Sequence, residues 1–374
     1  MPMTASGWAR AAAVLAVAAV FVGAAGAARA QKDPERTESI SEAAASPEVR
    51  RKLQEMRGEA RANRLGYTVG NTRALSRPNS ELLGDIDDPN ITPEQRAEQN
   101  RRAQELIQRD NQLRQQTQKD KRSQTELQRT VCNPASPKFH WYAENKVPPI
   151  RDQGGCGDCW AFAAVGAYES SHLIVNNKAA DGSEQYLLDC ARVADNKPAG
   201  NCTGGLAAFA FYHMSRAGLA TRKTVPYTAK ERVCTNPATP YKVVAWGYVN
   251  PKQDFPTREE IKKAICDYGP VATRMRVVSD NFKAYTGGVY RENVQSDDAG
   301  GGHAVVLVGW DDSKDAWLMR NSWGKDWGLS GYAWMAYGSN RIGRHTTWVR
   351  AASTSYSTES IEALRKELEI SDKK

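Results

Sequence analysis

Two cysteines three residues apart lie in the stretch from Gln153 to Phe162, which has the sequence QGGCGDCWAF. Its glycines predict a tight loop, and the apolar run that begins at Trp160 predicts a long buried helix from Cys159 to about Asn176. Cys159 would then stand in the first turn of this helix, where unpaired backbone N–H groups and the helix dipole stabilise a thiolate. Because the thiolate is the nucleophilic form of cysteine, this position suits covalent catalysis.

A Cys-x-x-Cys pair alone would also fit a disulfide or a redox site, and the downstream sequence favours the nucleophile. A cysteine nucleophile needs an imidazole base, and the imidazole needs a partner that orients it. His303 stands in the run GGGHAVVLVGW, and Asn321 stands in the run RNSWG. Together with Cys159 these residues predict a Cys-His-Asn site.

From about Phe139 to Val349 the chain resembles the papain-family (C1-type) cysteine peptidases. The motifs that carry the resemblance are Gln153, CGDCW at 156–160, SEQ at 183–185 before LLDC, CTGG at 202–205, His303, and NSWG at 321–324. The separation between Cys159 and His303 suits the family spacing of about 130–150 residues. The resemblance implies a thiol endopeptidase that hydrolyses peptide bonds through a thioester acyl-enzyme and is made as a zymogen.

The resemblance also implies a role for each site residue. Cys159 and His303 would rest as a thiolate–imidazolium pair, in which the thiolate attacks a peptide carbonyl and the imidazolium protonates the leaving amine. Asn321 would orient the imidazole, and Trp323 would cover the hydrogen bond between them. The side-chain amide of Gln153 and the backbone N–H of Cys159 would stabilise the oxyanion.

Substrate binding is expected at Gly204, Gly205 and Trp323. At the two glycines the lack of a side chain lets an extended peptide approach closely. The S2 pocket, which sets specificity in the family, would involve Leu206 and residues near Thr346 and Thr347. No pair of histidines lies between Cys190 and Cys234, which favours an endopeptidase over an exopeptidase. The histidines outside the site show no metal-ligand spacing, so neither a metal nor another cofactor is expected.

Asp158 departs from the serine that is usual in the family at this position. A carboxylate beside the nucleophile would oppose thiolate formation. We expect Asp158 to cap the helix and to point its charge to solvent. Two other functions stay open on sequence alone: a non-catalytic relative that binds a partner, and an acyl transferase or deamidase that uses the same three residues.

The first thirty residues predict a signal peptide, with Arg10 before an apolar run and an Ala-x-Ala site that ends at Ala30. A membrane anchor is the alternative, although the run is short and alanine-rich. We therefore expect an exported protein, secreted or periplasmic, without stable membrane association. The net charge of +8 comes from basic residues mixed with acidic ones, and no nucleic-acid motif is present.

Seven cysteines are consistent with an oxidising compartment, because six remain for disulfides if Cys159 is free. The resemblance implies two of the three pairs, and elimination leaves the third. These pairs are Cys156–Cys202, Cys190–Cys234 and, by elimination, Cys132–Cys266.

Residues 31–131, here called the N-terminal extension, are predicted to be a helical pro-region that lacks the best-known helix motif of the family's propeptides. Ser46, Pro47 and Glu48 predict a helix start, Gly66 a stop, and residues 67–78 an extended segment. The hypothesis is that Ala45 to Asp88 lies in the cleft and inhibits it. The alternative is a docking or solubilising extension. A second helix, from Pro93 to about Gln128, is expected as a solvated spacer or propeptide helix.

The predicted fold class is α+β, a papain-like two-lobe fold with a helical lobe and a β-barrel-like lobe, preceded by the helical N-terminal extension. The peptidase domain would span residues 132–350, mainly helical to about Tyr241 and mainly β after it. In the tail, 351–374, Ile361, Leu364 and Leu368 predict a short amphipathic helix that packs on the body or binds a partner. The expected partners are polypeptide substrates and, in the cleft, the chain's own N-terminal extension.

Overall fold

The computed structural model describes residues 32–117, 131–296, 298–356 and 363. The predicted signal peptide, the second predicted helix beyond Thr117, and Ile361, Leu364 and Leu368 of the tail lie outside the described residues. Among the helices within these ranges, none is long and apolar enough to cross a membrane.

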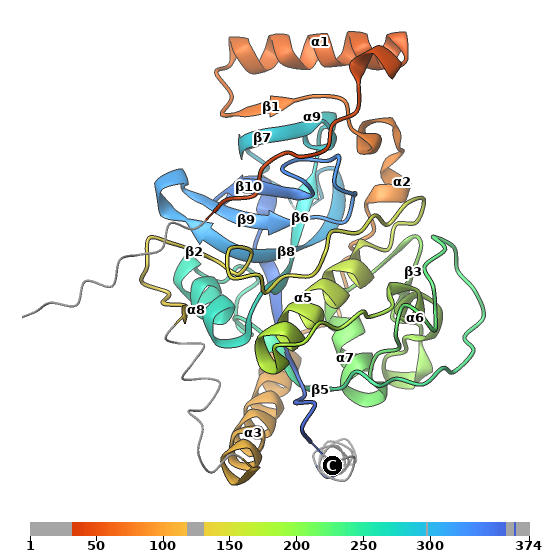
Figure 1. Cartoon of the computed structure of the whole chain (residues 1–374), viewed down its shortest axis with the longest axis vertical. Coiled ribbons are helices and arrows are strands. Elements are labelled where there is room, and N and C mark those ends of the chain that lie inside the picture. The colour runs from red at the N-terminus through yellow and green to blue at the C-terminus, as the bar shows by residue number, and fades with distance from the viewer. Residues whose placement is uncertain (1–31, 118–130, 297, 357–362, 364–374) are drawn as a thin grey trace, which may run out of the picture. The chain divides into compact units, whose positions relative to one another are not determined.

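The elements of the N-terminal extension precede those of the two lobes in the chain (Figure 1). In the extension they are η1 (Glu42–Ala44), α1 (Pro47–Ala62), β1 (Tyr67–Val69), η2 (Arg73–Ser76), α2 (Asn79–Leu82) and α3 (Pro93–Thr117). The helical lobe contains α5 (Cys159–Asn176), α6 (Glu184–Cys190), η3 (Ala194–Asn196), β3 (Gly200–Asn201), β4 (Gly204–Gly205) and α7 (Ala207–Ala217). The sheet lobe contains β2 (Lys138–His140), β5 (Val243–Tyr248), α8 (Arg258–Tyr268), β6 (Val271–Val277), α9 (Asp280–Lys283), β7 (Tyr285–Tyr290), β8 (Gly301–Asp311), η4 (Asp312–Lys314), β9 (Ala316–Arg320), β10 (Tyr332–Ala336), η5 (Ser339–Arg341) and β11 (Arg344–Ala351).

The central helix α5 has the bounds that the sequence predicts. Its apolar run is buried on all sides, which is the pattern of a helix enclosed by other elements. The helix ends where Asn177 adopts a left-handed conformation and its N–H bonds to the carbonyl of Leu173. α5 therefore forms the core of the helical lobe and presents its first turn to the sheet.

The sheet lobe is built on one sheet with the strand order β1-β7-β10-β9-β8-β6-β11-β5, and β2 pairs with β8. β8 lies between β6 and β9, with His303 opposite Met275 and Val306 opposite Arg320. Its run of apolar residues is buried on both faces. This strand thereby holds His303 in the interior, next to the helical lobe.

Two elements of the N-terminal extension, β1 and α3, pack on the sheet lobe (Figure 1). β1 adds an antiparallel strand to β7, with Tyr67 opposite Gly288. α3 covers β5, which is the last strand of the sheet. Ala103 and Leu106 of α3 are buried, so the expectation of a solvated spacer is wrong. The extended prediction for residues 67–78 is also only partly right, because η2 forms within it.

Three disulfides have the expected pairs: Cys156–Cys202, Cys190–Cys234 and Cys132–Cys266. The first two lie within the helical lobe. The third ties the start of the sheet lobe to α8. Within the described residues Cys159 is the cysteine without a disulfide.

Asn100 of α3 supplies the hydrogen bonds that a further strand would give to β5. Its side-chain nitrogen donates to the Tyr248 carbonyl at 2.7 Å, and its oxygen accepts the Tyr248 N–H at 2.8 Å. Asn100→Ala leaves both backbone groups without these partners, and we expect a loss of about 1–3 kcal/mol in the free energy of α3 docking. Hydrogen exchange of the Tyr248 amide measures the loss.

Glu105→Ala is the matched control for Asn100→Ala. Glu105 lies on the same helix and forms an exposed ion pair with Arg101. Such pairs contribute little, so this variant should exchange like the parent protein. Equal protection of Tyr248 in both variants would show that α3 docking does not depend on Asn100.

Candidate active site

Cys159 is the first residue of α5, and its side chain is completely buried against β8. The backbone N–H of Ala304 donates to the Cys159 sulfur at 3.4 Å. Because His303 precedes Ala304 on β8, this contact holds the thiol beside the histidine. The helix start and the central strand of the sheet thus bring together two residues that lie far apart in the sequence.

His303 is oriented by Asn321, which follows the end of β9. The Nε2 atom of His303 lies 2.8 Å from the Oδ1 atom of Asn321. An amide oxygen can only accept, so Nε2 carries the proton and Nδ1 is the nitrogen that can take one up. The Trp323 ring packs on the His303 ring with 4.7 Å between centroids, and Trp323 is completely buried.

Gln153 is also buried in this site, and its side chain is held at both ends. Its Oε1 atom accepts from the Ser322 hydroxyl at 2.6 Å, which leaves the Nε2 group to donate. Nε2 lies 3.1 Å from the carbonyl oxygen of Glu81 and 3.2 Å from that of Leu82. Sequence reasoning missed Ser322, although it stands between Asn321 and Trp323. Gln153 therefore donates to carbonyl oxygens of a peptide in the cleft.

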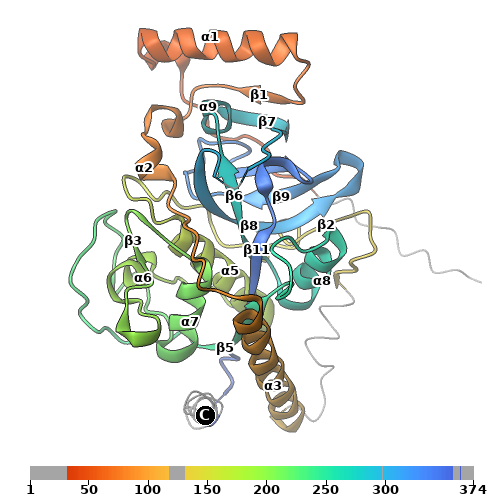
Figure 2. The ribbon, with the colours of Figure 1, turned by 180° about the vertical axis from the view of Figure 1, so that it is seen from behind.

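Residues 81–87 of the N-terminal extension, here called the cleft segment, supply that peptide. Figure 2 shows the chain between α2 and α3 crossing the face where the helical lobe meets the sheet. The N–H groups of Gly84 and Asp85 donate to the Gly302 carbonyl, each at 3.1 Å. The Gly205 N–H donates to Gly84, and the Gly205 carbonyl accepts from Ile86. The segment lies parallel to Gly205 as an added strand.

Glycines allow the cleft segment to approach this closely. A Cβ atom on Gly84 would lie 1.5 Å from the Gly157 carbonyl oxygen. One on Gly302 would lie 1.9 Å from the Asp85 carbonyl oxygen, and one on Gly204 would lie 2.4 Å from the Ile86 side chain. The predicted Gly204 and Gly205 thus both face an extended peptide, whereas sequence reasoning missed Gly84 and Gly302.

Burial under the cleft segment shifts the pKa of both reactive groups. Burial raises the pKa of the Cys159 thiol, the negative charge of Asp85 raises it further, and the Ala304 N–H opposes the shift. Burial lowers the pKa of His303 to about 4, although its bond to Asn321 acts in the other direction. The covered site therefore favours a neutral thiol and a neutral imidazole over the ion pair that the resemblance implies.

Asp158 corrects the expectation of a helix cap with a solvent-facing charge. It stands at the N-cap position of α5, but its side chain makes no capping hydrogen bond and is completely buried. The Tyr227 hydroxyl lies 2.9 Å and 3.0 Å from its two carboxylate oxygens. Burial raises the pKa of Asp158 well above its ordinary value, while the Tyr227 hydrogen bond acts in the other direction. The charge of Asp158 is one of the causes that raise the pKa of the Cys159 thiol.

Leu206 and Thr347, two of the positions at which the S2 pocket is predicted, line one pocket of the structure. Thr346 lies behind it, where its hydroxyl bonds to Thr273 at 2.7 Å. Arg274 and His345 also line the pocket, and sequence reasoning missed both.

In the part of the chain that the structure describes, no group of three or more His, Cys, Asp or Glu side chains could hold a metal ion.

The chain belongs to the papain family of cysteine proteases, because the model of that family matches residues 135–353. A cathepsin L-like peptidase of Aedes aegypti is 37% identical over 201 residues, which cover 52% of this chain and 57% of the relative. The thiol protease aleurain of Arabidopsis thaliana is 38% identical over 207 residues, which cover 54% and 56% of the two chains. The matches thus span less than two thirds of these relatives.

Two solved structures share the papain-like two-lobe fold. A digestive procathepsin L2 proteinase from the larval midgut of Tenebrio molitor has a TM-score of 0.62 and 23% identity, over 81% of this chain and 90% of that one. The Amb a 11 cysteine protease, a major ragweed pollen allergen, in its proform has a TM-score of 0.58 and 22% identity, over 82% and 89% of the two chains.

Gly84→Ala should uncover the thiol of Cys159. The added methyl group cannot fit against the Gly157 carbonyl, so the cleft segment must shift out. A destabilisation of about 1.4 kcal/mol already changes the exposed population tenfold. We therefore expect iodoacetamide to alkylate Cys159 in the unprocessed chain at least about ten times faster than in the parent.

Gly66→Ala is the control for this measurement. A Cβ atom at Gly66 would meet only the Val289 carbonyl oxygen, at the ordinary contact distance of 3.5 Å. This variant should be alkylated at the parental rate. An unchanged rate in Gly84→Ala would refute the close approach at Gly157.

Carboxylates that hold the cleft region should release it only in acid. Burial raises the pKa of Asp152, but the hydrogen bonds from Arg77 and the Gly154 N–H, together with the positive charge of Arg77, outweigh burial and lower the pKa below 3.8. Burial also raises the pKa of Asp87, but its contacts with Arg274 and Arg344 together lower this pKa below its ordinary value, with Arg274 contributing most. A lowered pKa gives a contribution that is present above about pH 4 and is lost as the pH falls through the lowered value. Burial raises the pKa of Asp85 to about 6, so its protonation favours docking as the pH falls from 6.

Hydrogen exchange of the cleft segment between pH 3 and 7 tests this pH dependence. The Cys159→Ala chain is used because it cannot process itself, and rates are corrected for intrinsic exchange. We expect protection above about pH 4 and its loss below that value. Arg77→Gln removes the pair with Asp152 and should weaken protection at neutral pH. Loss of protection already near pH 6 would contradict the assignment.

Proposed function

We propose that this protein is an exported cysteine endopeptidase, made as a zymogen, that hydrolyses peptide bonds through Cys159, His303 and Asn321. The observation that carries the proposal is the cleft segment itself. It lies as an extended peptide against Gly205, with carbonyl groups at Gln153, over the Cys159 thiol. The cleft therefore binds peptide backbone at the nucleophile.

Departure of the N-terminal extension would activate the chemistry. Water would return to the site, and the charge of Asp85 would leave it, so the pKa of Cys159 would fall and that of His303 would rise. A proton would then pass from the thiol to Nδ1 of His303, which gives the thiolate–imidazolium pair. Asn321 would hold the ring through Nε2 during this transfer.

The thiolate would attack the substrate carbonyl carbon, forming a C–S bond while the carbonyl electron pair moves to oxygen. The Gln153 side chain and the Cys159 backbone N–H would donate to this oxyanion. Its collapse would break the C–N bond, and His303 would protonate the leaving amine. Water, deprotonated by His303, would then hydrolyse the thioester and release the acid and the thiol.

The structure supports a shielding role for Trp323 better than a substrate contact. Its ring packs on His303 and is completely buried, so it would keep water from the hydrogen bond between His303 and Asn321. Gly204 and Gly205 would bind substrate backbone, since the cleft segment uses them in this way.

We infer that the N-terminal extension is the cleft inhibitor. Export to a secreted or periplasmic site is supported by the three disulfides.

The protein that starts at Gln31 tests the proposal beside a Cys159→Ala control. Both are incubated under mild reduction from acidic to neutral pH with a fluorogenic dipeptide, and intact mass is followed over time. We expect substrate cleavage and a shortened N-terminus in the parent protein alone. Gln153→Ala, once processed, should lose about 10²–10³ in kcat, because one oxyanion donor is removed.

Three results would contradict the proposal. Absence of cleavage after removal of the N-terminal extension would leave a protein that binds peptides without cutting them. Ligated peptide in place of hydrolysed product would assign the same thioester to acyl transfer. Equal cleavage by the Cys159→Ala control would exclude Cys159 as the nucleophile.

A further inference from the structure

Arg274 is a buried cation in the S2 pocket, and its charged partners belong to the N-terminal extension. It comes from β6, and 9% of its side chain is exposed. Its Nε atom donates to Asp85, and its Nη1 atom lies 2.6 Å from Asp87. Within the described residues, the ion-pair partners of Arg274 are these two carboxylates of the cleft segment.

The peptidase part of the pocket offers Arg274 a neutral partner. Nδ1 of His345 lies 3.2 Å from the guanidinium, while Nε2 of the same ring faces Asp254 at 2.9 Å. Burial and the positive charges of Arg274 and Arg344 together lower the pKa of His345, although Asp254 acts in the other direction. The ring is therefore neutral at neutral pH and accepts a hydrogen bond from Arg274 without balancing its charge.

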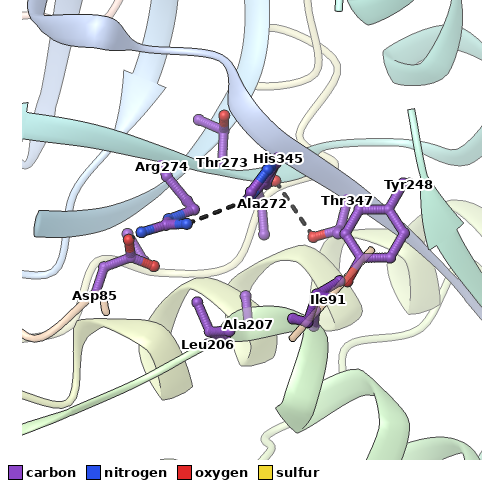
Figure 3. A pocket seen from close by; sticks show the side chains of 12 residues that line it. Asp85, Ile91, Leu206, Ala207, Tyr248, Ala272, Thr273, Arg274, His345 and Thr347 are labelled. Carbon is purple, nitrogen blue, oxygen red and sulfur yellow. Dashed lines mark hydrogen bonds and ion pairs between the residues drawn. The ribbon is translucent and has the colours of Figure 1, made fainter. Parts of the chain in front are cut away.

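The Asp85 side chain occupies the pocket as the side chain of a bound peptide would (Figure 3). Its neighbours Gly84 and Ile86 are the two residues that pair with Gly205, so the Asp85 side chain points from the strand into the pocket. About 20 Å³ remains free there, room for a water molecule and no more. Any extended peptide that pairs with Gly205 would send one side chain to the same place.

Loss of the N-terminal extension removes both carboxylates from Arg274. The peptidase residues that line the pocket around the guanidinium include the apolar Leu206, Ala207, Ala208 and Ala272. A buried cation without an anion is destabilised, and a guanidinium binds a carboxylate through paired hydrogen bonds. Arg344 also contacts Asp87, at 2.9 Å, but it has a second partner in the peptidase part, Asp254 at 3.6 Å.

We propose that the S2 pocket selects an acidic side chain, Asp or Glu, at the second substrate residue before the scissile bond, with Arg274 as the specificity-determining residue. The inference rests on the proposed peptidase function and deepens it. Asp85 occupies the position of that substrate side chain in the unprocessed chain. A lysine or arginine side chain at this position meets a like charge and is excluded.

A set of fluorogenic peptides tests the inference on the processed enzyme. The peptides differ only at the second residue before the scissile bond, which is Asp, Glu, Asn, Gln, Leu or Lys. We expect kcat/KM for each acid to exceed that for its own amide by about 10- to 100-fold, as for hydrogen bonds between charged groups. A preference for Leu together with equal rates for Asp and Asn would overturn the inference.

Variants at Arg274 assign the preference to this residue. Arg274→Gln is made together with Asp85→Asn, so that the zymogen folds with a neutral pair in the pocket. For this double variant we expect kcat/KM for each acidic peptide, divided by kcat/KM for the matching amide peptide, to fall to about one. Cleavage of the Leu peptide should continue. Arg258→Gln is the matched control, because Arg258 lies on α8 with 52% of its side chain exposed and pairs with Asp315. It should keep the parental ratio.

The same assay separates failure of the inference from failure of the proposed function. Alkylation of Cys159 after processing shows that the site is open. If no peptide of the set is then cleaved, the peptidase proposal fails and the inference with it. If the Leu peptide is cleaved well and the acidic peptides are not, only the acidic selectivity fails. A variant ratio that stays parental assigns the preference to a residue other than Arg274.

Discussion

The contact between the first turn of α5 and the middle of β8 is the constraint on which the rest of this structure depends. The Ala304 N–H on the Cys159 sulfur joins the helical lobe to the sheet at the reactive atom itself. His303 is the residue before Ala304, and Asn321 follows the strand next to β8, so one contact sets the relative positions of all three. Burial of α5 on all sides keeps that helix from shifting.

Inhibition and recognition use the same atoms of this cleft. The cleft segment takes the backbone hydrogen bonds of Gly205, the amide of Gln153 and the charge of Arg274, which are the groups that a substrate would need. It also excludes water, and burial keeps the thiol and the imidazole neutral. A peptide that fills the cleft in this way blocks access and reactivity together, so its removal restores both.

Much of the candidate site could be predicted because its chemistry restricts the residue types. A thiol, an imidazole and an amide in distinctive motifs identify Cys159, His303 and Asn321, and an uninterrupted apolar run identifies α5 with its bounds. Two expectations failed where the decisive partner lies far along the chain. Asp158 was expected at the surface, but Tyr227 meets it in the interior. The second helix was expected as a solvated spacer or a propeptide helix, and the solvated spacer failed because Asn100 bonds to Tyr248 at the sheet edge.

The sequence by itself determined the candidate reactive residues, the number of cysteines left for disulfides and the helical character of the N-terminal extension, since these follow from residue type and local spacing. Only the tertiary structure decided which side chains meet in the cleft. Arg274 stands in the strand VATRMRV, and no local pattern shows that its guanidinium enters the pocket beside Gly205. Asp85 likewise reads as one acid among several in a loop. Arg274 and Asp85 meet, and become buried, only when β6, β4 and the cleft segment pack together. Burial and charge pairing are properties of contacts between segments that lie far apart in the sequence.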